Sequence, residues 1–177
     1  MAAQNMIFAG FGGQGVLFSG KIVAYAGLID NKQVSWLPSY GPEMRGGTAN
    51  CSVCISDIPI GSPLVTEPDV LVAMNSPSFD KFIETVAPGG KVIIDSSLVD
   101  RHTDRKDIEV FRVPATQLSN DEHLEGIANI ILLGKVLKES QFASLETVHK
   151  AIDKCVPASK AHLLEHNKRA IALGMSL

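Results

Sequence analysis

Gly10-Phe11-Gly12-Gly13-Gln14-Gly15 follows a short apolar run, residues 6–9, and precedes a segment whose apolar residues have helical spacing. This order predicts a turn between a buried strand and a helix. Backbone N–H groups at the start of a helix, together with the helix dipole, hold anions such as phosphate. Glycine permits a close approach of backbone to ligand that a Cβ would block. The stretch therefore predicts an anion-facing loop built from Gly10, Gly12, Gly13, Gln14 and Gly15.

The same glycines satisfy the G-x-G-x-x-G pattern of dinucleotide-binding turns. An NAD site also needs an acidic residue near the end of the second strand, where it binds the ribose hydroxyls. Residues 36–39 occupy that place and contain no Asp or Glu, since Asp30 lies before the strand and Glu43 well beyond it. No Lys-Ser or Lys-Thr pair follows the last glycine, so the Walker pattern is not met. A free-standing NAD enzyme is disfavoured, and a turn whose glycines serve only helix–sheet packing remains the alternative.

Strands and helices are expected to alternate over the first two-thirds of the chain. The periodicity predicts strands at 6–9, 33–37, 48–56, 70–74, 91–95 and 108–113, and helices at 16–30, 78–86, 127–138, 145–155 and 159–173. The last helix has Ser159 at a cap position and ends near Gly174. We therefore expect an α/β fold: a mostly parallel, Rossmann-like sheet with helices on both faces and a helical C-terminal tail. At 177 residues, 45% of them hydrophobic, residues 1–177 are expected to form one domain.

Composition argues against several classes of function. A net charge of −3 and an aromatic content of 6% favour neither nucleic acid nor an anionic membrane as a partner. The longest apolar stretches, such as 127–133, are far shorter than the roughly 20 residues that span a bilayer. The first residues lack the basic region of a signal peptide. Three cysteines make no disulfide framework, so the cytoplasm is the expected location.

A second unusual segment, Pro38-Ser39-Tyr40-Gly41-Pro42-Glu43-Met44-Arg45-Gly46-Gly47, joins two of the expected strands. Its prolines stiffen the path of the chain, and its glycines permit turns and close contacts. Arg45 can present a planar fork to a phosphate or a carboxylate, and Glu43 can orient that arginine or contact a partner. Tyr40, Glu43 and Arg45 are therefore the candidates of a second loop that faces a cofactor or a partner. An exposed loop with an ordinary ion pair is the alternative.

Cysteines and histidines are weaker candidates. Cys51 and Cys54 fall in one expected strand, where side chains three residues apart point to opposite faces and cannot share a metal ion. We interpret both as core residues. His162 and His166, four residues apart, are expected to share one face of the last helix as a surface pair.

Polar residues follow two of the expected strands, at the carboxyl ends where ligands of α/β proteins gather. They are Asn75-Ser76 and Asp95-Ser96-Ser97. They can line a crevice, but packing or helix capping explains them equally well. No Ser-His-Asp or Cys-His set can be assigned, so neither a catalytic residue nor a metal ligand is predicted.

The two glycine-rich segments come in an order and at a spacing that are specific. Together with Ser56-Asp57-Ile58-Pro59-Ile60 and the later Pro68-Asp69, they resemble the gamma subunit of 2-oxoacid:ferredoxin oxidoreductases. Pyruvate synthase and ketoisovalerate oxidoreductase contain the same module. The likeness is detailed in the strand-rich first part of the chain and continues loosely through residues 126–129 and the helical tail. Residues 40–47 are especially similar to subunits of the 2-oxoglutarate branch.

The resemblance implies one subunit of a heteromeric enzyme, inactive on its own. Such enzymes oxidatively decarboxylate a 2-oxoacid with coenzyme A, giving acyl-CoA, carbon dioxide and reduced ferredoxin. Thiamine diphosphate sits between the alpha and beta subunits, and iron–sulfur clusters belong to beta or delta chains. The gamma chain then carries neither, packs beside the active site and helps form the coenzyme A-facing surface. An indolepyruvate-type subunit is the sister interpretation; alternatives from other classes are a stand-alone Rossmann-like nucleotide-binding or regulatory module and a purely structural assembly protein.

Overall fold

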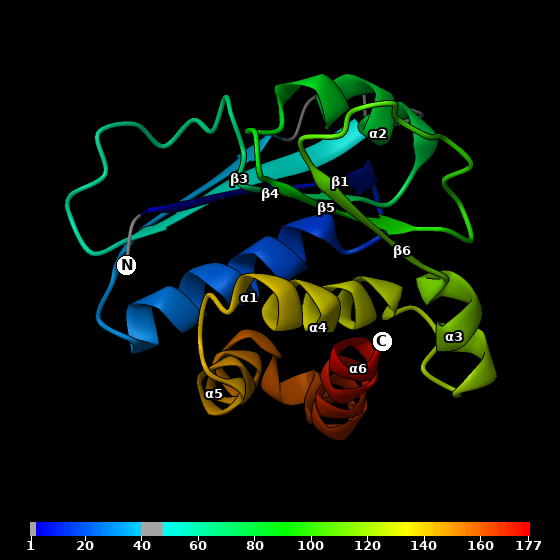
Figure 1. Ribbon diagram of the computed structural model, residues 1–177. Coiled ribbons are helices and arrows are strands. Elements are labelled where there is room, and N and C mark those ends of the chain that lie inside the picture. Colours follow the sequence, from blue (N-terminus) through cyan, green and yellow to red (C-terminus); the bar gives the residue numbers. More distant parts are fainter. Residues whose placement is uncertain (1–2, 40–47) are drawn as a thin grey trace.

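The computed structural model describes residues 3–39 and 48–177, which form a layered α/β structure around one sheet (Figure 1). The strands are β1 (Gln4–Phe11), β2 (Gln33–Ser39), β3 (Thr48–Ser56), β4 (Val70–Ala73), β5 (Lys91–Asp95) and β6 (Glu109–Val113). The helices are α1 (Val16–Ile29), α2 (Ser76–Phe82), α3 (Ala115–Asp121), α4 (Ala128–Ser140), α5 (Leu145–Cys155) and α6 (Leu164–Ser176), with short 3-10 turns η2 (Ile83–Thr85) and η3 (Ala158–Leu163).

The sheet has the strand order β2-β3-β1-β4-β5-β6 and is mixed. β1, β4, β5 and β6 pair in parallel, as the alternation of strands and helices predicts. β3 runs antiparallel to both β1 and β2. Only residues 40–47 connect β2 to β3, which is too short for the crossover that a parallel pair requires. The expected α/β fold with a mostly parallel sheet is confirmed, with this one reversed strand.

The helices cover the sheet unequally. α2 lies on one face, while α1 and α4 lie on the other, and α5 and α6 form a further layer outside α1 and α4 (Figure 1). Each face has its own apolar cluster: a large one under α1 and α4, and a smaller one under α2. α4 is buried along residues 129–137 because the sheet and the outer helices enclose it from both sides. The expected helical tail thus thickens one side of the molecule.

The C-terminal helix differs from its prediction. Residues 158–163 form the 3-10 turn η3, in which Lys160 has non-helical dihedral angles, and α6 begins only at Leu164 without a side-chain cap. Ser159 therefore caps no α-helix, and the prediction of one helix from 159 to 173 was wrong. The helix ends at Ser176, near Gly174 as expected, but Gly174 itself does not end it. Gly174 instead lies against α4, where a side chain would collide with the main-chain oxygen of Ile131.

None of the helices in residues 3–39 and 48–177 is long and apolar enough to cross a membrane.

Candidate functional site

The glycine loop connects β1 to α1 at the carboxyl end of β1, as predicted. Its shape depends on the side chain of Gln14. The amide oxygen of Gln14 accepts a hydrogen bond from the backbone N–H of Phe11 at 2.6 Å, and its amide nitrogen donates to the main-chain oxygen of Met74 at 3.1 Å. Gly10 leaves room for this arrangement, because a Cβ there would lie 2.6 Å from the Gln14 oxygen. Gln14 therefore ties the loop to the end of β4.

Gly13 and Gly15 both have positive φ, at 92° and 76°, which only glycine adopts without strain. Their surroundings differ. Gly15 is the N-cap of α1, and a Cβ on it would lie 2.5 Å from the side-chain nitrogen of Asn129. Apart from its chain neighbours, no atom of the described residues lies within 4 Å of the place where a Cβ on Gly13 would stand. Packing thus accounts for Gly15, whereas Gly13 is the open point of the loop.

Asn129, in the first turn of α4, fixes the start of α1. Its side-chain nitrogen donates to the main-chain oxygen of Gly15 at 3.0 Å and lies 3.1 Å from the hydroxyl of Ser19. That hydroxyl in turn lies 3.4 Å from the main-chain oxygen of Asn129. The N-termini of α1 and α4 are therefore held side by side behind the glycine loop.

The first turn of α1 leaves backbone donors free. The first intrahelical bond joins the N–H of Ser19 to the oxygen of Gly15, and no side chain caps the helix. Within the described parts of the chain, the N–H groups of Val16, Leu17 and Phe18 consequently have no acceptor. Such groups bind anions because they carry the positive end of the helix dipole.

Two depressions meet at Gly13. One, of about 260 Å³, is mainly apolar and is lined by Phe11, Gly12, Gly13, Gly15, Val16, Leu17, Phe18 and Ala49. The other, of about 280 Å³, lies where β4, β5 and β6 end and is lined by Gly13, Gln14, Met74, Leu98, Thr116, Ser119, Asn120, Gly126 and Ala128. Neither set of lining residues contains Lys or Arg. A phosphate here would be held by backbone and hydroxyl donors, and its charge would be balanced from elsewhere.

Asn75 and Asp95, two of the polar residues expected after β4 and β5, bind backbone N–H groups at the starts of helices. The carboxylate of Asp95 is fully buried and accepts from the backbone N–H and the hydroxyl of Thr116, at 3.3 and 2.5 Å, at the start of α3. The side-chain oxygen of Asn75 accepts from the N–H of Ser78 at 2.8 Å and caps α2. Asn75 is thus a helix cap, and Asp95 holds the first turn of α3 to the end of β5.

The cysteines are buried, as expected for core residues. Cys51 faces α1, with its sulfur 3.6 Å from the main-chain oxygen of Val16, and Cys54 lies on the other face of the sheet. Burial raises the pKa of the Cys51 thiol to about 12 and that of the Cys155 thiol to about 11, and it also raises the pKa of Cys54. Among the residues that the structure describes, no three His, Cys, Asp or Glu side chains gather as metal ligands. Cys51 and Cys54 lie on opposite faces of the sheet, so they cannot share an iron–sulfur cluster.

His162 lies in η3 and His166 in α6, so they do not share one helix as expected. A ring nitrogen of His166 lies 3.3 Å from the main-chain oxygen of His162. Tyr40, Glu43 and Arg45 lie outside the described residues, so their role remains a prediction.

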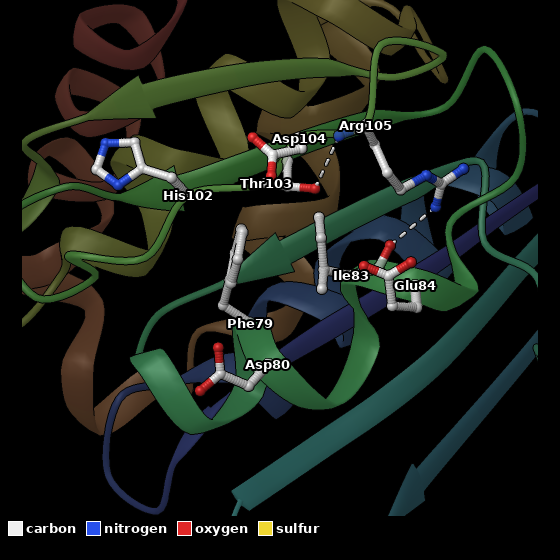
Figure 2. A pocket seen from close by; sticks show the side chains of 8 residues that line it. All are labelled: Phe79, Asp80, Ile83, Glu84, His102, Thr103, Asp104 and Arg105. Carbon is white, nitrogen blue, oxygen red and sulfur yellow. Dashed lines mark hydrogen bonds between the residues drawn. The ribbon is translucent and has the colours of Figure 1, made fainter.

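Another depression, of about 400 Å³, lies between α2 with η2 and residues 102–105 (Figure 2). The guanidinium of Arg105 is held in structural contacts, donating to the main-chain oxygen of Ile83 at 3.0 Å and to the carboxylate of Asp107 at 2.6 Å. This hydrogen-bonded pair lowers the pKa of Asp107 and raises that of Arg105. The depression has mixed charges, and none of the predicted site residues lines it.

Sequence patterns alone do not identify Asn129, Leu98, Thr116 or Asn120 as neighbours of the glycine loop. They come from three later segments that only the folded sheet brings to Gly13. The available signal was positional: Leu98 and Thr116 follow the ends of β5 and β6, where α/β proteins place their sites.

Comparison with known proteins agrees with this architecture. The family model described as pyruvate ferredoxin/flavodoxin oxidoreductase matches residues 5–177. The chain is 39% identical over 159 residues to the 2-oxoglutarate synthase subunit KorC of Methanocaldococcus jannaschii, covering 87% of this chain and 84% of that one. The gamma subunit of keto/oxoacid ferredoxin oxidoreductase from Geobacter sulfurreducens superimposes with a TM-score of 0.84 at 30% identity, covering 98% and 96% of the two chains.

A third likeness concerns the fold alone. The 2-oxoglutarate:ferredoxin oxidoreductase of Magnetococcus marinus, solved with 2-oxoglutarate, coenzyme A and succinyl-CoA bound, superimposes with a TM-score of 0.86 at 20% identity. The match covers 99% of this chain and 31% of that longer chain.

These observations define an α/β subunit with an open glycine turn, in which the described residues form no metal cluster. The chain belongs to the pyruvate ferredoxin/flavodoxin oxidoreductase family and is the gamma subunit of a 2-oxoacid:ferredoxin oxidoreductase, part of a multisubunit complex.

Proposed function

We propose that this subunit packs beside the active site of the complex and that its glycine loop faces the phosphates of coenzyme A. The observation that carries the proposal is Gly13, an open glycine with positive φ between two depressions and next to the free N–H groups of α1. Backbone donors at a helix N-terminus suit a phosphate ester. Gly10, Gly12, Gln14 and Gly15 complete the turn.

Tyr40, Glu43 and Arg45 are proposed as the second, cofactor- or partner-facing loop. Because the described lining of both depressions lacks Lys and Arg, the phosphate charge needs a cation from outside it. Arg45 meets that need, since an arginine–phosphate contact is a charge-assisted hydrogen bond. The coenzyme A bound in the Magnetococcus marinus enzyme, which shares this fold, supports the same choice of ligand.

The proposed reaction of the whole complex is the oxidative decarboxylation of a 2-oxoacid to acyl-CoA with reduction of ferredoxin. We favour a 2-oxoglutarate-type substrate, because the Methanocaldococcus relative is named a 2-oxoglutarate synthase subunit. Alpha and beta subunits, with or without a delta subunit, are the proposed partners and carry thiamine diphosphate and the iron–sulfur clusters. The three cysteines of this chain are free, which suits a cytoplasmic enzyme.

The test uses the whole complex with Gly13→Ala and a matched control, Gly89→Ala. Both glycines have positive φ, 92° and 79°, and among the described residues only their chain neighbours lie within 4 Å of a Cβ position, so the conformational cost is similar. Gly89 precedes β5, at the end of the sheet away from the glycine loop.

We expect Gly13→Ala to raise the KM for coenzyme A about tenfold, as loss of one phosphate contact does, with the KM for the 2-oxoacid and the subunit composition unchanged. Gly89→Ala should leave both KM values unchanged. Equal coenzyme A kinetics for the two variants would refute the assignment of the loop. A wild-type chain that does not assemble with thiamine-dependent subunits would refute the proposed partners.

A further inference from the structure

The β2 edge of the sheet lacks the usual protection of an exposed strand. β2 pairs with β3 on one side, and no strand of the described chain pairs with its other side. Its seven residues, QVSWLPS, include no charged side chain, and neither do the nine residues of β3, TANCSVCIS. Solvent-facing edges are normally guarded by Lys or other charges, because free N–H and C=O groups recruit further strands. Among the described residues, Pro38 guards β2 from within, and the ion pair of Lys32 with Asp57 lies only at its start.

Exposed apolar side chains gather around this edge. Trp36 and Leu37 of β2 are 37% and 38% exposed. Leu28 of α1, at 56%, follows Gly27, which packs against Val34 of β2.

The segment after β3 adds two more exposed apolar side chains to this edge. Ile58 is 69% exposed and Leu64 is 58% exposed. The N–H of Val65 lies 3.4 Å from the hydroxyl of Ser52, the register partner of Leu37, which sets Leu64 near the edge. Gln33, Val34 and Ser35 also line a depression of about 310 Å³ with Pro59, Ile60 and Pro63. We call Leu28, Trp36, Leu37, Ile58 and Leu64 the β2 edge surface; clustered exposed apolar groups of this kind mark interaction sites.

The β2 edge surface is continuous with the end of the sheet that carries the glycine loop. Ser39, the last residue of β2, pairs with Asn50, and the neighbouring Ala49 pairs with Gly10. Phe11, 39% exposed, follows at the rim of the depression beside Gly13. A protein that covers the glycine loop can therefore extend along β2.

We propose that the β2 edge surface docks a partner subunit of the same oxidoreductase complex, which adds an uncharged extended segment alongside β2. The inference rests on the proposed function. An uncharged edge favours an uncharged partner segment, because burying an unpaired charge there is costly. Strand addition supplies main-chain hydrogen bonds, and Trp36 and Leu37 supply apolar contacts. The place of the surface, next to the glycine loop, favours a subunit that also completes the active site. In the Magnetococcus enzyme the module with this fold is 31% of a longer chain.

Hydrogen exchange measured by mass spectrometry on the isolated chain and on the purified complex tests strand addition directly. The amides of 33–39 that β3 does not use are expected to exchange about tenfold more slowly, or slower still, in the complex. The amides of 109–113, on the opposite edge, should change little. Equal exchange of 33–39 in the two samples would overturn the proposal.

Substitutions of two equally exposed residues test the apolar contacts of the β2 edge surface. Leu37 and Val110 are each 38% exposed, on opposite edge strands. Leu37→Lys should fold with an unchanged Tm and lose at least about tenfold in affinity for the other subunits, since a charge is buried unpaired. Val110→Lys should assemble normally.

Normal assembly of Leu37→Lys with the partner subunits overturns this inference and leaves the coenzyme A proposal untouched, because the latter is read from KM. A wild-type homodimer that Leu37→Lys dissociates, with complex formation intact, identifies a second copy of the chain as the occupant and equally overturns it.

Discussion

The two edge strands of the sheet, β6 and β2, differ in the side chains that they present. At the β6 edge, Glu109 lies 3.6 Å from the amine of Lys91, and the guanidinium of Arg112 donates to the main-chain oxygens of Val99 and Arg101 at 2.8 and 2.9 Å. At the β2 edge, residues 33–39 have no charge with which to make such contacts. The first edge is tied down by its own chain, and the second presents apolar side chains.

This contrast separates an edge adapted to water from an edge adapted to protein. Ion pairs that are half-exposed contribute little stability, but they prevent further strands from adding. An apolar edge gains its stability only when something covers it. The β2 edge should therefore govern assembly, whereas changes on the β6 side should affect only the stability of the isolated chain.

The largest effect is expected for Lys135→Ala, on the β6 side. The Lys135 side chain is 9% exposed, its amine lies 2.7 Å from the carboxylate of Glu139, and it stands 4.6 Å from the ring centre of Phe111 in β6. Removing it leaves Glu139 without this partner and removes a cation–π contact, so unfolding should become easier by about 2–3 kcal/mol. In a chain of this size, calorimetry should show a Tm lower by about 5–10 °C.

The control is Lys150→Ala, which breaks another i,i+4 pair, with Glu146, whose side chains are 58% and 78% exposed. Its Tm should stay close to that of the wild type, since exposed pairs are worth little. Equal losses for the two variants would show that the burial of Lys135 makes its ion pair no stronger than the exposed one.

A smaller effect is expected for Trp36→Ala, on the β2 side. The indole nitrogen lies close to Gly20 of α1, and the indole hydrogen bond to the Cys51 thiol partly offsets the burial that raises the thiol pKa to about 12. Loss of the ring should destabilise the chain by about 1–2 kcal/mol. It should also speed iodoacetamide labelling of Cys51 at pH 8, followed by peptide mass spectrometry.

Leu37→Ala serves as the partner variant, because Leu37 is exposed to the same extent as Trp36 but lies on the other face of β2. Its stability should change by less than about 0.5 kcal/mol. A large loss of stability in Leu37→Ala would mean that the β2 edge surface is already packed in the isolated chain. The two edges of the sheet would then not differ as proposed.

Local patterns predicted the elements that local physics determines. β5, residues 91–95, was bounded correctly, because a buried strand after Pro88-Gly89-Gly90 has a clear signal. Residues 145–155 formed the expected helix, with Ser144 as its cap. The kink at Lys160 escaped prediction, since 3-10 and α turns place residues on nearly the same side of the chain. The direction of β3 was likewise not predicted from the alternation pattern.

The candidate site likewise has features that local patterns predict and features that they do not. Positive φ at Gly13 and Gly15 agrees with the loop predicted from spacing. The ties that shape the loop, from Gln14 to Met74 and from Asn129 to Gly15, span 60 and 114 residues of sequence. Such contacts follow from strand order and helix packing, which no local pattern contains.

The smallest expected effect is a pH dependence of the β6 side that residues 34–39 do not share. A hydrogen bond from Arg105 lowers the pKa of Asp107, and a hydrogen bond from Ser76, then the charge of Arg101, lowers that of Asp100. A carboxyl whose pKa is lower in the folded than in the unfolded protein stabilises the folded state. The stabilisation is fully present above the unfolded-state pKa, near 4, and is lost as the pH falls through the folded-state pKa.

The segment that contains these carboxyls, residues 99–113, should therefore open more readily between about pH 4 and pH 2. Hydrogen exchange corrected for intrinsic rates should show this, while residues 34–39, which have no titratable side chain, should keep their protection. Asp57, after β3, also has a lowered pKa through Lys32, so Asp57→Asn is the background for the comparison. Equal loss of protection at both edges in that background would mean that charge does not distinguish them.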